Sequence, residues 1–514
     1  MKKRQIINII NFIRAVDPWD MVDLETPVRE QIRLMKKHGL RGTFLLQYDA
    51  LLKPVYVDLM KSLDPEQFEI GVWFETVQPQ VEKVGLQWTG RFPWDWHPHC
   101  GFSVGYTKEQ REKLVDVLFE EFKSIFGYYP RVFGSWFYDT HTVRYILEKY
   151  GIDAMCNCKE QFGTDGYTMW GGYYGQAYYP SRNNVFMPAQ SKENQLPVPI
   201  FRMLGSDPVY QYDHGLDIET GANKIQTVIS LEPVYRAEEN EVGGGVPEWV
   251  DWFMRENFNG DCLTFGYAQA GQENSFGWYK MGEGLTYQFA EFERLQKEGK
   301  ITVETLGESG RWFKETYSAT PASAITAHTA YDDPDKNSVW YCSKNYRVNL
   351  YCDHGNMRVR DIHVFSDRHI DPYENAVCPG AQSVYETLPV VDGNRHTGGG
   401  ILGGAYLSYV DGTPVDIGDM TFTDCGEGRA TVSYGDVSFE LHENGMRVTA
   451  NHPFRIDAKY GTDDHLPAVQ SLEEDKLSLE YDGVGYSIKL LCGRFDSETC
   501  IMSDGCTVES EFEA

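Results

Sequence analysis

Residues 131–141 read RVFGSWFYDTH, a short apolar run that ends in aromatic, acidic and imidazole side chains. The apolar run predicts a buried strand. A strand that only closes a core needs no polar cluster at its end, so this ending indicates a site. The rest of the sequence is needed to predict which fold brings such strand ends together, and what they bind.

The same unit recurs over residues 1–315: an apolar strand, a polar or aromatic loop and an amphipathic segment. The clearest predicted helix, 108–127, has apolar residues at three- and four-residue spacing and is stopped by Gly127. Alternating strands and helices imply parallel strands joined by crossovers. They predict a (β/α)7-type barrel rather than an open dinucleotide-binding sheet, because no GxGxxG follows the first strand. The predicted strands are 5–17, 42–52, 68–76, 131–141, 152–163, 199–208 and 262–273, with a last strand at 301–308.

From residue 316 to residue 514 the helical periodicity nearly vanishes, and strand-like segments follow one another with turns between them. This pattern predicts an all-β sandwich as a second domain. Only Trp340 of the 12 tryptophans lies in this part, and its histidines are scattered. We therefore expect a structural domain that covers part of the barrel.

Composition excludes several classes of protein. The net charge of −29, from 47 basic and 76 acidic residues, disfavours binding to nucleic acids and anionic membranes. The apolar run near the N-terminus is broken by Asn8 and Asn11 and lacks a cleavage site, so it reads as the first barrel strand. The 11 scattered cysteines suit reduced thiols and a cytoplasmic location. The sequence leaves the oligomeric state open.

Nearly every predicted barrel strand ends in a carboxylate, an amide or an indole. Barrel loops after the strands gather on one face, so these ends form a polar cup with aromatic walls. Such a cup suits a carbohydrate, whose C–H faces lie on aromatic rings while polar groups take the hydroxyls. The alternative is that the aromatic side chains pack together to close long loops. The expected substrate-binding residues are Arg14, Glu75, Trp96, Trp136, Tyr138, Asp165, Tyr173, Arg182, Gln269 and Trp278.

Asp139 on the fourth strand and Glu273 after the seventh are the expected catalytic pair, since glycoside hydrolysis needs two carboxyl groups across the bond. His141 is expected to orient Asp139. Asp17 is a further catalytic candidate, and Glu75 is a reserve for the pair. Two alternatives stay open: Asp139 caps the following helix, and Glu273 forms a salt bridge within its loop.

A metal site would need clustered His, Asp or Glu side chains. His97, His99 and the pair Asp139–His141 are the candidates, but spacing fixes no third ligand, so no metal or other cofactor is expected. Neither GxSxG nor a P-loop motif occurs, which leaves serine hydrolases and NTPases without support.

The strand order, with TFLLQYDALL in the second strand and FGSWFYDTH in the fourth, resembles the glycoside hydrolase/deacetylase β/α-barrel superfamily. The resemblance implies a barrel, followed in some members by a β-sandwich, with a nucleophile ending the fourth strand and an acid after the seventh. Asp139 and Glu273 match those two positions. The deacetylase motif TFDDG is replaced by NFIRAVD, and H(S/T)xxH is absent.

Together these features predict a glycoside hydrolase that acts on oligosaccharides or glycosides. Two other functions stay open. One is a metal-dependent carbohydrate deacetylase of the same fold, with the metal on Asp17 and the His97/His99 loop. The other is a carbohydrate-binding protein without catalytic activity.

Overall fold

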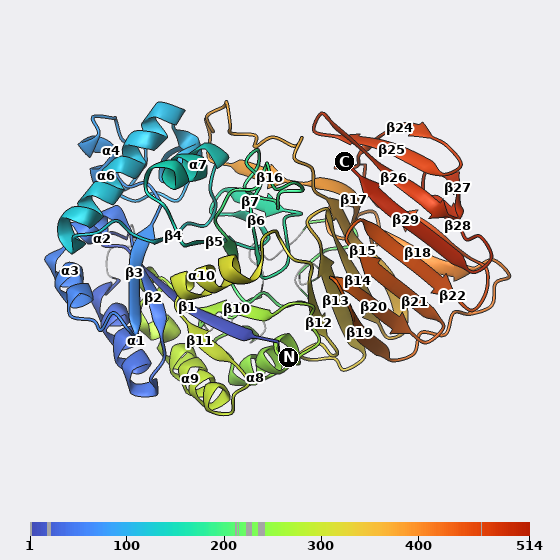
Figure 1. Cartoon of the computed structure of the whole chain (residues 1–514), viewed down its shortest axis with the longest axis horizontal. Coiled ribbons are helices and arrows are strands. Elements are labelled where there is room, and N and C mark those ends of the chain that lie inside the picture. The colour runs from blue at the N-terminus through green and yellow to red at the C-terminus, as the bar shows by residue number, and fades with distance from the viewer. Residues whose placement is uncertain are drawn as a thin grey trace.

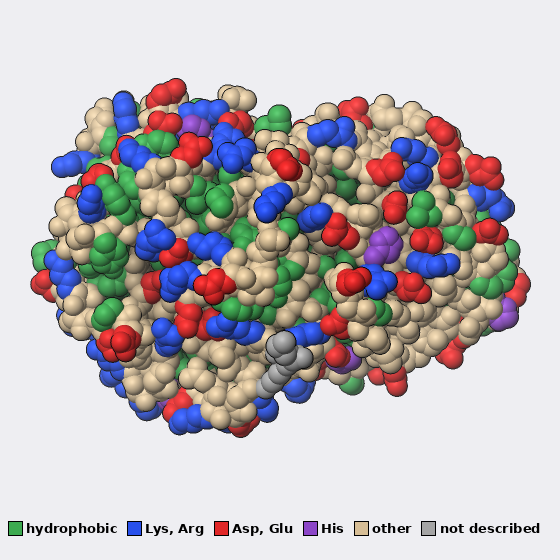
Figure 2. All heavy atoms as spheres, viewed as in Figure 1, with side chains coloured by type: hydrophobic (Ala, Val, Ile, Leu, Met, Phe, Trp, Pro, Cys, Tyr) green, Lys and Arg blue, Asp and Glu red, His purple; other side chains and the backbone are tan. Residues whose placement is uncertain are grey.

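A computed structural model describes residues 3–17, 22–210, 213, 215–222, 229–234, 242–463 and 465–514. These residues form two parts that lie side by side, an α/β barrel in blue to yellow and a sandwich of antiparallel strands in orange and red (Figure 1). None of the described helices is long and apolar enough to cross a membrane. On the face drawn in Figure 2, acidic and basic side chains are interspersed over both parts.

The barrel sheet has seven parallel strands in the order β10-β1-β2-β3-β4-β5-β9. Two shorter strands extend it: β11 (Thr302–Glu304) pairs with the first half of β1, and β8 (Ala177–Tyr178) pairs with β9. The predicted (β/α)7-type barrel followed by an all-β sandwich is confirmed. The seven strands are β1 (Gln5–Ile13), β2 (Gly42–Leu46), β3 (Phe68–Trp73), β4 (Val132–Gly134), β5 (Ala154–Cys158), β9 (Ile200–Met203) and β10 (Gly266–Ala270).

The seam between β9 and β10 is held by a side chain, since no ladder joins these strands in the described part of the chain. The Leu204 amide donates to Gln269 Oε1 at 2.8 Å, and Gln269 Nε2 donates to the Ala270 carbonyl at 2.6 Å. Gln269 was expected to bind substrate. The structure gives its amide the structural role of bridging the seam of the barrel, and substrate binding by Gln269 stays a prediction.

Both faces of the barrel sheet are buried. Alternate residues of β1, such as Ile6 and Ile10, join the cluster inside the barrel, while Ile7 and Ile9 between them pack against the helices. The helix α6 begins with a capping box between Thr107 and Gln110. The helices around the barrel are α1 (Glu25–His38), α2 (Tyr48–Leu51), α3 (Pro54–Lys61), α4 (Gln78–Lys83), α5 (Pro98–Gly101), α6 (Lys108–Phe126), α7 (Thr140–Lys149), α8 (Pro247–Asn257), α9 (Trp278–Lys297) and α10 (Leu306–Thr316).

The sandwich consists of two antiparallel sheets packed face to face. The first sheet contains β12 (Ser323–Ala327), β13 (Lys336–Cys342), β14 (Tyr346–Asp353), β15 (Asn356–Val364), β17 (Leu388–Asp392), β18 (Gly404–Tyr409), β23 (Phe454–Lys459), β27 (Arg494–Ser497) and β28 (Cys500–Met502). The second contains β19 (Met420–Gly426), β20 (Arg429–Tyr434), β21 (Val437–His442), β22 (Gly445–Ala450), β24 (Ala468–Leu472), β25 (Lys476–Tyr481), β26 (Val484–Cys492) and β29 (Thr507–Glu513).

Strands from both parts share a small third sheet, in which β16 (Ser383–Glu386) pairs with β7 (Tyr167–Trp170) and β7 with β6 (Gln161–Thr164). The chain leaves α10 at Thr316, but it later returns to the barrel through β16. The boundary at residue 316 therefore stays a prediction as a boundary between independently folding units.

A buried arginine joins the sandwich to the barrel. Arg347 on β14 makes an ion pair with Glu160 from the loop after β5 and a two-pronged pair with Asp361, both bonds of which measure 2.8 Å. All three side chains have no exposed surface. Beside them, Tyr174 stacks on Trp340 with ring centroids 3.8 Å apart. Burial of these charges is tolerated only because they are paired.

We predict that Arg347→Met lowers the free energy of unfolding by about 3–5 kcal/mol, because it leaves Glu160 and Asp361 buried without their cation. Denaturant unfolding measures this change. The control is Arg455→Met, which removes a surface pair with Asp457 and is expected to cost about 1 kcal/mol or less. Equal stability of the two variants would contradict the structural role given to Arg347.

Candidate active site

The loops after β1, β3 and β10 meet at one end of the barrel, because the strands run in the same direction. Arg14 follows β1 directly, and a side chain of the loop after β10 holds its backbone. The Arg14 amide donates to Asn274 Oδ1 at 3.0 Å, and Asn274 Nδ2 donates to the Arg14 carbonyl at 2.9 Å. The asparagine thus completes the backbone hydrogen bonds of Arg14 as a neighbouring strand would.

Gly271 is what allows the loop after β10 to come this close. Its φ of 95° lies in the left-handed region, and a Cβ at this position would be only 2.3 Å from the Ile10 carbonyl oxygen. No other residue type fits there without moving β1. The turn at Gly271 brings Glu273 to Arg14.

The Arg14 guanidinium joins two carboxylates from different strands. Its Nη2 atom lies 3.1 Å from Glu75 Oε2 and 2.6 Å from Glu273 Oε2. Arg14 and Glu75 are each 1% exposed, whereas the Glu273 side chain retains 11%. Gln47 Nε2 adds a hydrogen bond of 3.4 Å to the same Glu75 oxygen, and Ser275 donates its hydroxyl to Glu273 Oε1. The two carboxylates thus face each other across one cation.

Burial raises the pKa of Glu273 to about 7, although the Arg14 charge opposes this shift and the neighbouring charge of Glu75 adds to it. Burial also raises the pKa of Glu75, against the charge of Arg14. The pKa of Asp49, which accepts a hydrogen bond from the Ala15 amide at 3.0 Å, rises to about 6 for the same reason. Several acids around one cation cannot all stay ionised, so this site holds an exchangeable proton near neutral pH.

Two further expected residues belong to this neighbourhood. Asp17 is half-buried and acts electrostatically on Arg14. The Asp165 side chain is exposed, but the surrounding protein displaces part of its water, and this desolvation raises its pKa. The charges of Arg14 and His97 lower the pKa. The structure therefore brings Arg14, Glu75 and Glu273 into contact, and Asp17 and Asp165 act on Arg14 or respond to it electrostatically. Trp19, at the end of the same loop, lies outside the described residues.

Aromatic side chains surround the cluster. The guanidinium of Arg14 lies 3.7 Å from the ring centroid of Trp94, which is a cation–π contact. Phe12 stacks on Trp73 at 3.9 Å, and the half-buried Trp136 meets both rings edge-on at 5.3 Å. The indole N–H groups of Trp73 and Trp94 lower the pKa of Glu75, but neither completes a hydrogen bond. Aromatic walls around the carboxylates are thus present.

Two expected tryptophans lie farther along the chain. Trp96 is half-buried, lies 5.8 Å from Trp94 between ring centroids and stacks with Arg91 at 4.7 Å. Trp278 begins α9 and its ring covers Gly282, where an added Cβ would be 2.7 Å from the indole. Trp96 therefore extends the wall formed by Trp94, whereas the contact described for Trp278 lies within its own helix.

The structure gives Asp139 the helix-capping role that was the alternative to catalysis, and its catalytic role stays a prediction. Asp139 is the N-cap of α7 and is fully buried. Its Oδ1 accepts from the Thr142 amide at 2.9 Å and pairs with Arg111 at 2.8 Å, and its Oδ2 accepts from the Thr142 hydroxyl at 2.6 Å. Burial raises the pKa of Asp139, but Arg111 and these hydrogen bonds hold it below its usual range. None of these partners is shared with Glu273.

Four more expected residues make contacts away from the Arg14 cluster, so their roles in the site stay predictions. His141 pairs with Glu112 on α6 at 3.0 Å. The Tyr138 hydroxyl donates to the Phe133 and Cys156 carbonyls inside the protein. Tyr173 donates to Ser323 Oγ of the sandwich at 2.8 Å, and Arg182 is exposed in a loop where its carbonyl accepts from Arg144. The loop-closing alternative therefore describes Tyr138 and Tyr173 correctly.

Sequence reasoning did not select Asn274, Gln47, Asp49 and Trp94 as site residues. Gln47 and Asp49 were recognised at the end of the second strand, but nothing in the sequence set them apart from the other strand ends. Trp94 lies within the aromatic loop 88–99, where spacing does not select one ring. Asn274 has no distinguishing pattern, because its role depends on a loop of a different strand.

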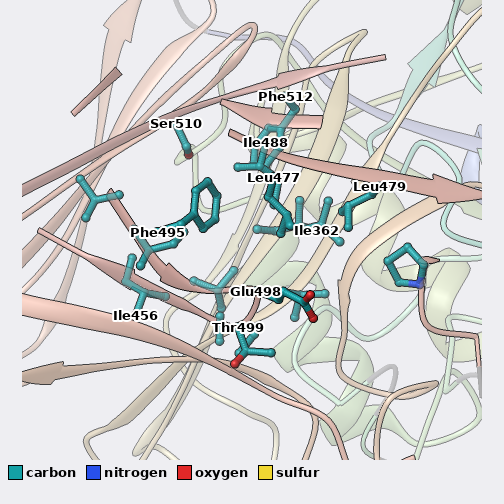
Figure 3. A pocket seen from close by; sticks show the side chains of 18 of the residues that line it. Ile362, Ile456, Leu477, Leu479, Ile488, Phe495, Glu498, Thr499, Ser510 and Phe512 are labelled. Carbon is teal, nitrogen blue, oxygen red and sulfur yellow. The ribbon is translucent and has the colours of Figure 1, made fainter. Parts of the chain in front are cut away.

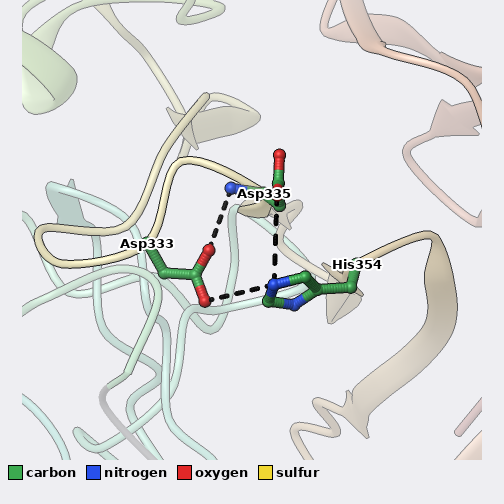
Figure 4. A group of neighbouring side chains, drawn as sticks. All are labelled: Asp333, Asp335 and His354. Carbon is green, nitrogen blue, oxygen red and sulfur yellow. Dashed lines mark hydrogen bonds and ion pairs between the residues drawn. The ribbon is translucent and has the colours of Figure 1, made fainter.

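Two groups in the described part of the chain offer three metal-type ligand atoms each: Asp333, Asp335 and His354, and the buried Asp361, His363 and Asp392. The first lies on the sandwich surface, where His354 Nε2 is 3.6 Å from Asp333 (Figure 4). Lys336 also pairs with the Asp333 carboxylate. The second shares Asp361 with Arg347. Asp17, His97 and His99 form no such group among the described residues, and His97 instead bonds Asp95 at 2.6 Å.

Comparison with solved structures places this barrel among known folds. A candidate glycoside hydrolase/deacetylase from Parabacteroides distasonis matches with a TM-score of 0.56 and 16% identity, covering 75% of this chain and 91% of that chain. A candidate polysaccharide deacetylase from Mycobacterium smegmatis matches with a TM-score of 0.37 and 12% identity over 61% of this chain and 92% of its own. A GH57 branching enzyme from Thermococcus kodakaraensis matches with a TM-score of 0.32 and 10% identity over 62% and 72%.

No family model matches the chain, and no curated protein matches it with significance. The Parabacteroides match confirms, at the level of fold, the resemblance to glycoside hydrolase/deacetylase barrels that the strand order indicated.

We predict that Asp139→Ala lowers the free energy of unfolding by about 3–5 kcal/mol, because Arg111 loses its carboxylate in a buried position. Glu112→Ala is the matched control, since it removes a half-exposed carboxylate from the neighbouring helix and is expected to cost about 1 kcal/mol or less. Chemical denaturation of both variants measures the difference. An Asp139→Ala protein as stable as the control would favour a functional role for Asp139 over the capping role.

Proposed function

We propose that this protein is a carbohydrate-active hydrolase that cleaves glycosidic bonds with Glu75 and Glu273. The observation that carries the proposal is the contact of both carboxylates with one nitrogen of Arg14. The two oxygens are no farther apart than the sum of these two contact distances. That limit is below the separation of about 6.5–9.5 Å between the carboxyl groups of inverting glycosidases, so it favours the retaining type, in which the carboxyl groups lie closer together.

Glu273 suits the role of general acid. Its pKa of about 7 keeps a substantial fraction protonated at neutral pH, and its side chain is the more exposed of the two. The proton would pass from a Glu273 carboxyl oxygen to the oxygen of the leaving sugar as the glycosidic bond breaks. Protonation of Glu273 also weakens its ion pair with Arg14, so that Arg14 then interacts mainly with Glu75.

Glu75 suits the role of nucleophile. Arg14 and Gln47 both contact its Oε2, so the carboxylate is fixed, and the charge of Arg14 opposes the rise in pKa that burial causes. Attack on the anomeric carbon would form a glycosyl ester, and water activated by the deprotonated Glu273 would then release the sugar. The aromatic rings of Trp94, Trp96 and Trp136 offer surfaces on which the C–H faces of a sugar can lie.

The fold match supports a carbohydrate substrate, because the matched Parabacteroides protein is described as a glycoside hydrolase/deacetylase. The choice of glycosidic cleavage over deacetylation depends on the paired carboxylates. The expected metal ligands of the deacetylase alternative, Asp17, His97 and His99, do not form a cluster of metal-type ligand atoms among the described residues.

We predict that Glu75→Gln and Glu273→Gln each lower kcat by roughly 10²–10⁴, because each removes one of two groups that act in the same transition state. Aryl glycosides and natural oligosaccharides serve as substrates, and thermal unfolding checks that the variants fold. The fold is expected to persist, since the remaining carboxylate still pairs with Arg14. Glu112→Gln, outside the cluster, is the control and should leave kcat unchanged.

Near-full turnover by either variant would refute the pair. Acetate release from acetylated sugars without cleavage of any glycoside would instead identify a deacetylase.

We predict that kcat/KM falls above about pH 7. The general acid works only when protonated, and the raised pKa of Glu273 means that its proton is lost as the pH passes about 7. On the acidic side, activity should fall at a pH above the usual range of a glutamate, because burial raises the pKa of Glu75 as well. A pH–rate profile on a substrate with a good leaving group checks the assignment. Because such a substrate needs little acid assistance, its kcat/KM should decrease much less at alkaline pH. An unchanged alkaline limb would argue against Glu273 as the acid.

A further inference from the structure

The two sheets of the sandwich enclose a cavity of about 320 Å³ (Figure 3). It is lined by residues of β15, β17, β18, β23, β27 and β28 of the first sheet and of β22, β24, β25, β26 and β29 of the second. Its wall is almost wholly aliphatic or aromatic, with Ile456, Leu477, Ile488 and Phe512 pointing inward from opposite sheets. Nothing in the proposed barrel chemistry uses this cavity.

The hollow is not a sign of loose packing throughout the sandwich. In the half formed by β13, β14 and β20, the core residues Val339, Val348 and Val432 have no exposed surface. In the other half, Ile488 and Phe495 keep 7% and 8% exposure although they point between the sheets. The cavity is therefore a local feature of the core between the two sheets.

Water is a poor occupant of such a space. The cavity has room for roughly ten water molecules at about 30 Å³ each, but a buried water needs two to four polar partners. The wall offers few, and the Ser510 hydroxyl already contacts the Met446 carbonyl at 3.4 Å. An empty apolar cavity of this size would forfeit much of the stability of a domain, because the side chains around it lose their packing partners. An apolar ligand resolves both difficulties.

The mouth of the cavity selects the kind of apolar ligand. Glu498 and Thr499, both exposed, lie in the turn between β27 and β28 at its edge. The described residues that line the cavity include no lysine, arginine or histidine. A carboxylate or phosphate head group would therefore meet a negative charge without a balancing cation, whereas a hydroxyl or ammonium group would be accepted.

We infer that the sandwich carries a binding site for a single hydrocarbon chain whose head group is neutral or cationic. The chain lies between the sheets, and its head group is placed beside Glu498 and Thr499. The volume lies at the lower end of the range of small-molecule pockets, about 300–1,000 Å³, and so fits one chain and no bulky ring system.

Isothermal titration calorimetry with the full chain tests the inference, using 1-decanol, decyltrimethylammonium and decanoate below their critical micelle concentrations. We expect saturable 1:1 binding of the first two, and decanoate to bind about tenfold more weakly than decyltrimethylammonium. Val508→Phe, which places a ring in the cavity, should weaken binding at least about tenfold. Val410→Phe, the same change at an exposed residue outside the cavity, should leave binding unchanged.

Glu498→Gln separates the head-group claim from the chain claim. It should retain 1-decanol binding and reduce the preference for decyltrimethylammonium over decanoate. If circular dichroism shows that Val508→Phe does not fold, Ala458→Leu, a smaller filling change in the same wall, replaces it. The inference is overturned if no ligand binds saturably, or if binding persists in the folded filling variant.

Discussion

A buried guanidinium is the constraint on which the barrel depends. Arg14 is almost wholly removed from water, and an isolated charge in such a place would be strongly destabilising. Its burial is compensated by Glu75 from the loop after β3 and Glu273 from the loop after β10, which both reach one of its nitrogens. Gly271 and Asn274 exist at their positions to make that approach possible. Because β1 pairs with β10, β11 and β2, a shift of Arg14 would disturb half of the barrel.

The same constraint creates the chemistry. One cation cannot keep every nearby acid ionised, since Glu75, Glu273 and Asp49 are all largely withdrawn from water. The acid with the weakest hold on its negative charge takes up the proton, and the raised pKa of Glu273 marks it as that acid. The same side chains thus form a structural ion pair with Arg14 when both glutamates are ionised, and the proposed acid–base pair when Glu273 is protonated. This is also why two carboxylates of one residue type can take different roles within a few ångströms.

The strands could be predicted from sequence because each is a short apolar run between a helix and a polar loop, and all seven barrel strands lie within the predicted ranges. Arg14, Glu75 and Glu273 were found for the same local reason, since they directly follow strands. Asp139 follows a strand too, but its partner Arg111 comes from the preceding helix, and sequence spacing does not disclose a contact of that kind. Tyr173 and Glu160 likewise bind side chains of the sandwich more than 100 residues away. The polar residues whose contacts local pattern did not predict are thus ones whose partners are set by tertiary structure.

Two regions of the sandwich are under different constraints. Its first strands pack against the barrel through Arg347 and Trp340, so their positions are fixed by buried charges and stacked rings. No barrel element contributes to the wall of the cavity, and the two sheets are held apart there only by their own side chains. A domain that served only to cover the barrel would gain stability by closing this space, because larger side chains at Ala405 or Ala458 would fill it. The small side chains at these two positions keep the space between the sheets open, as the proposed ligand site requires.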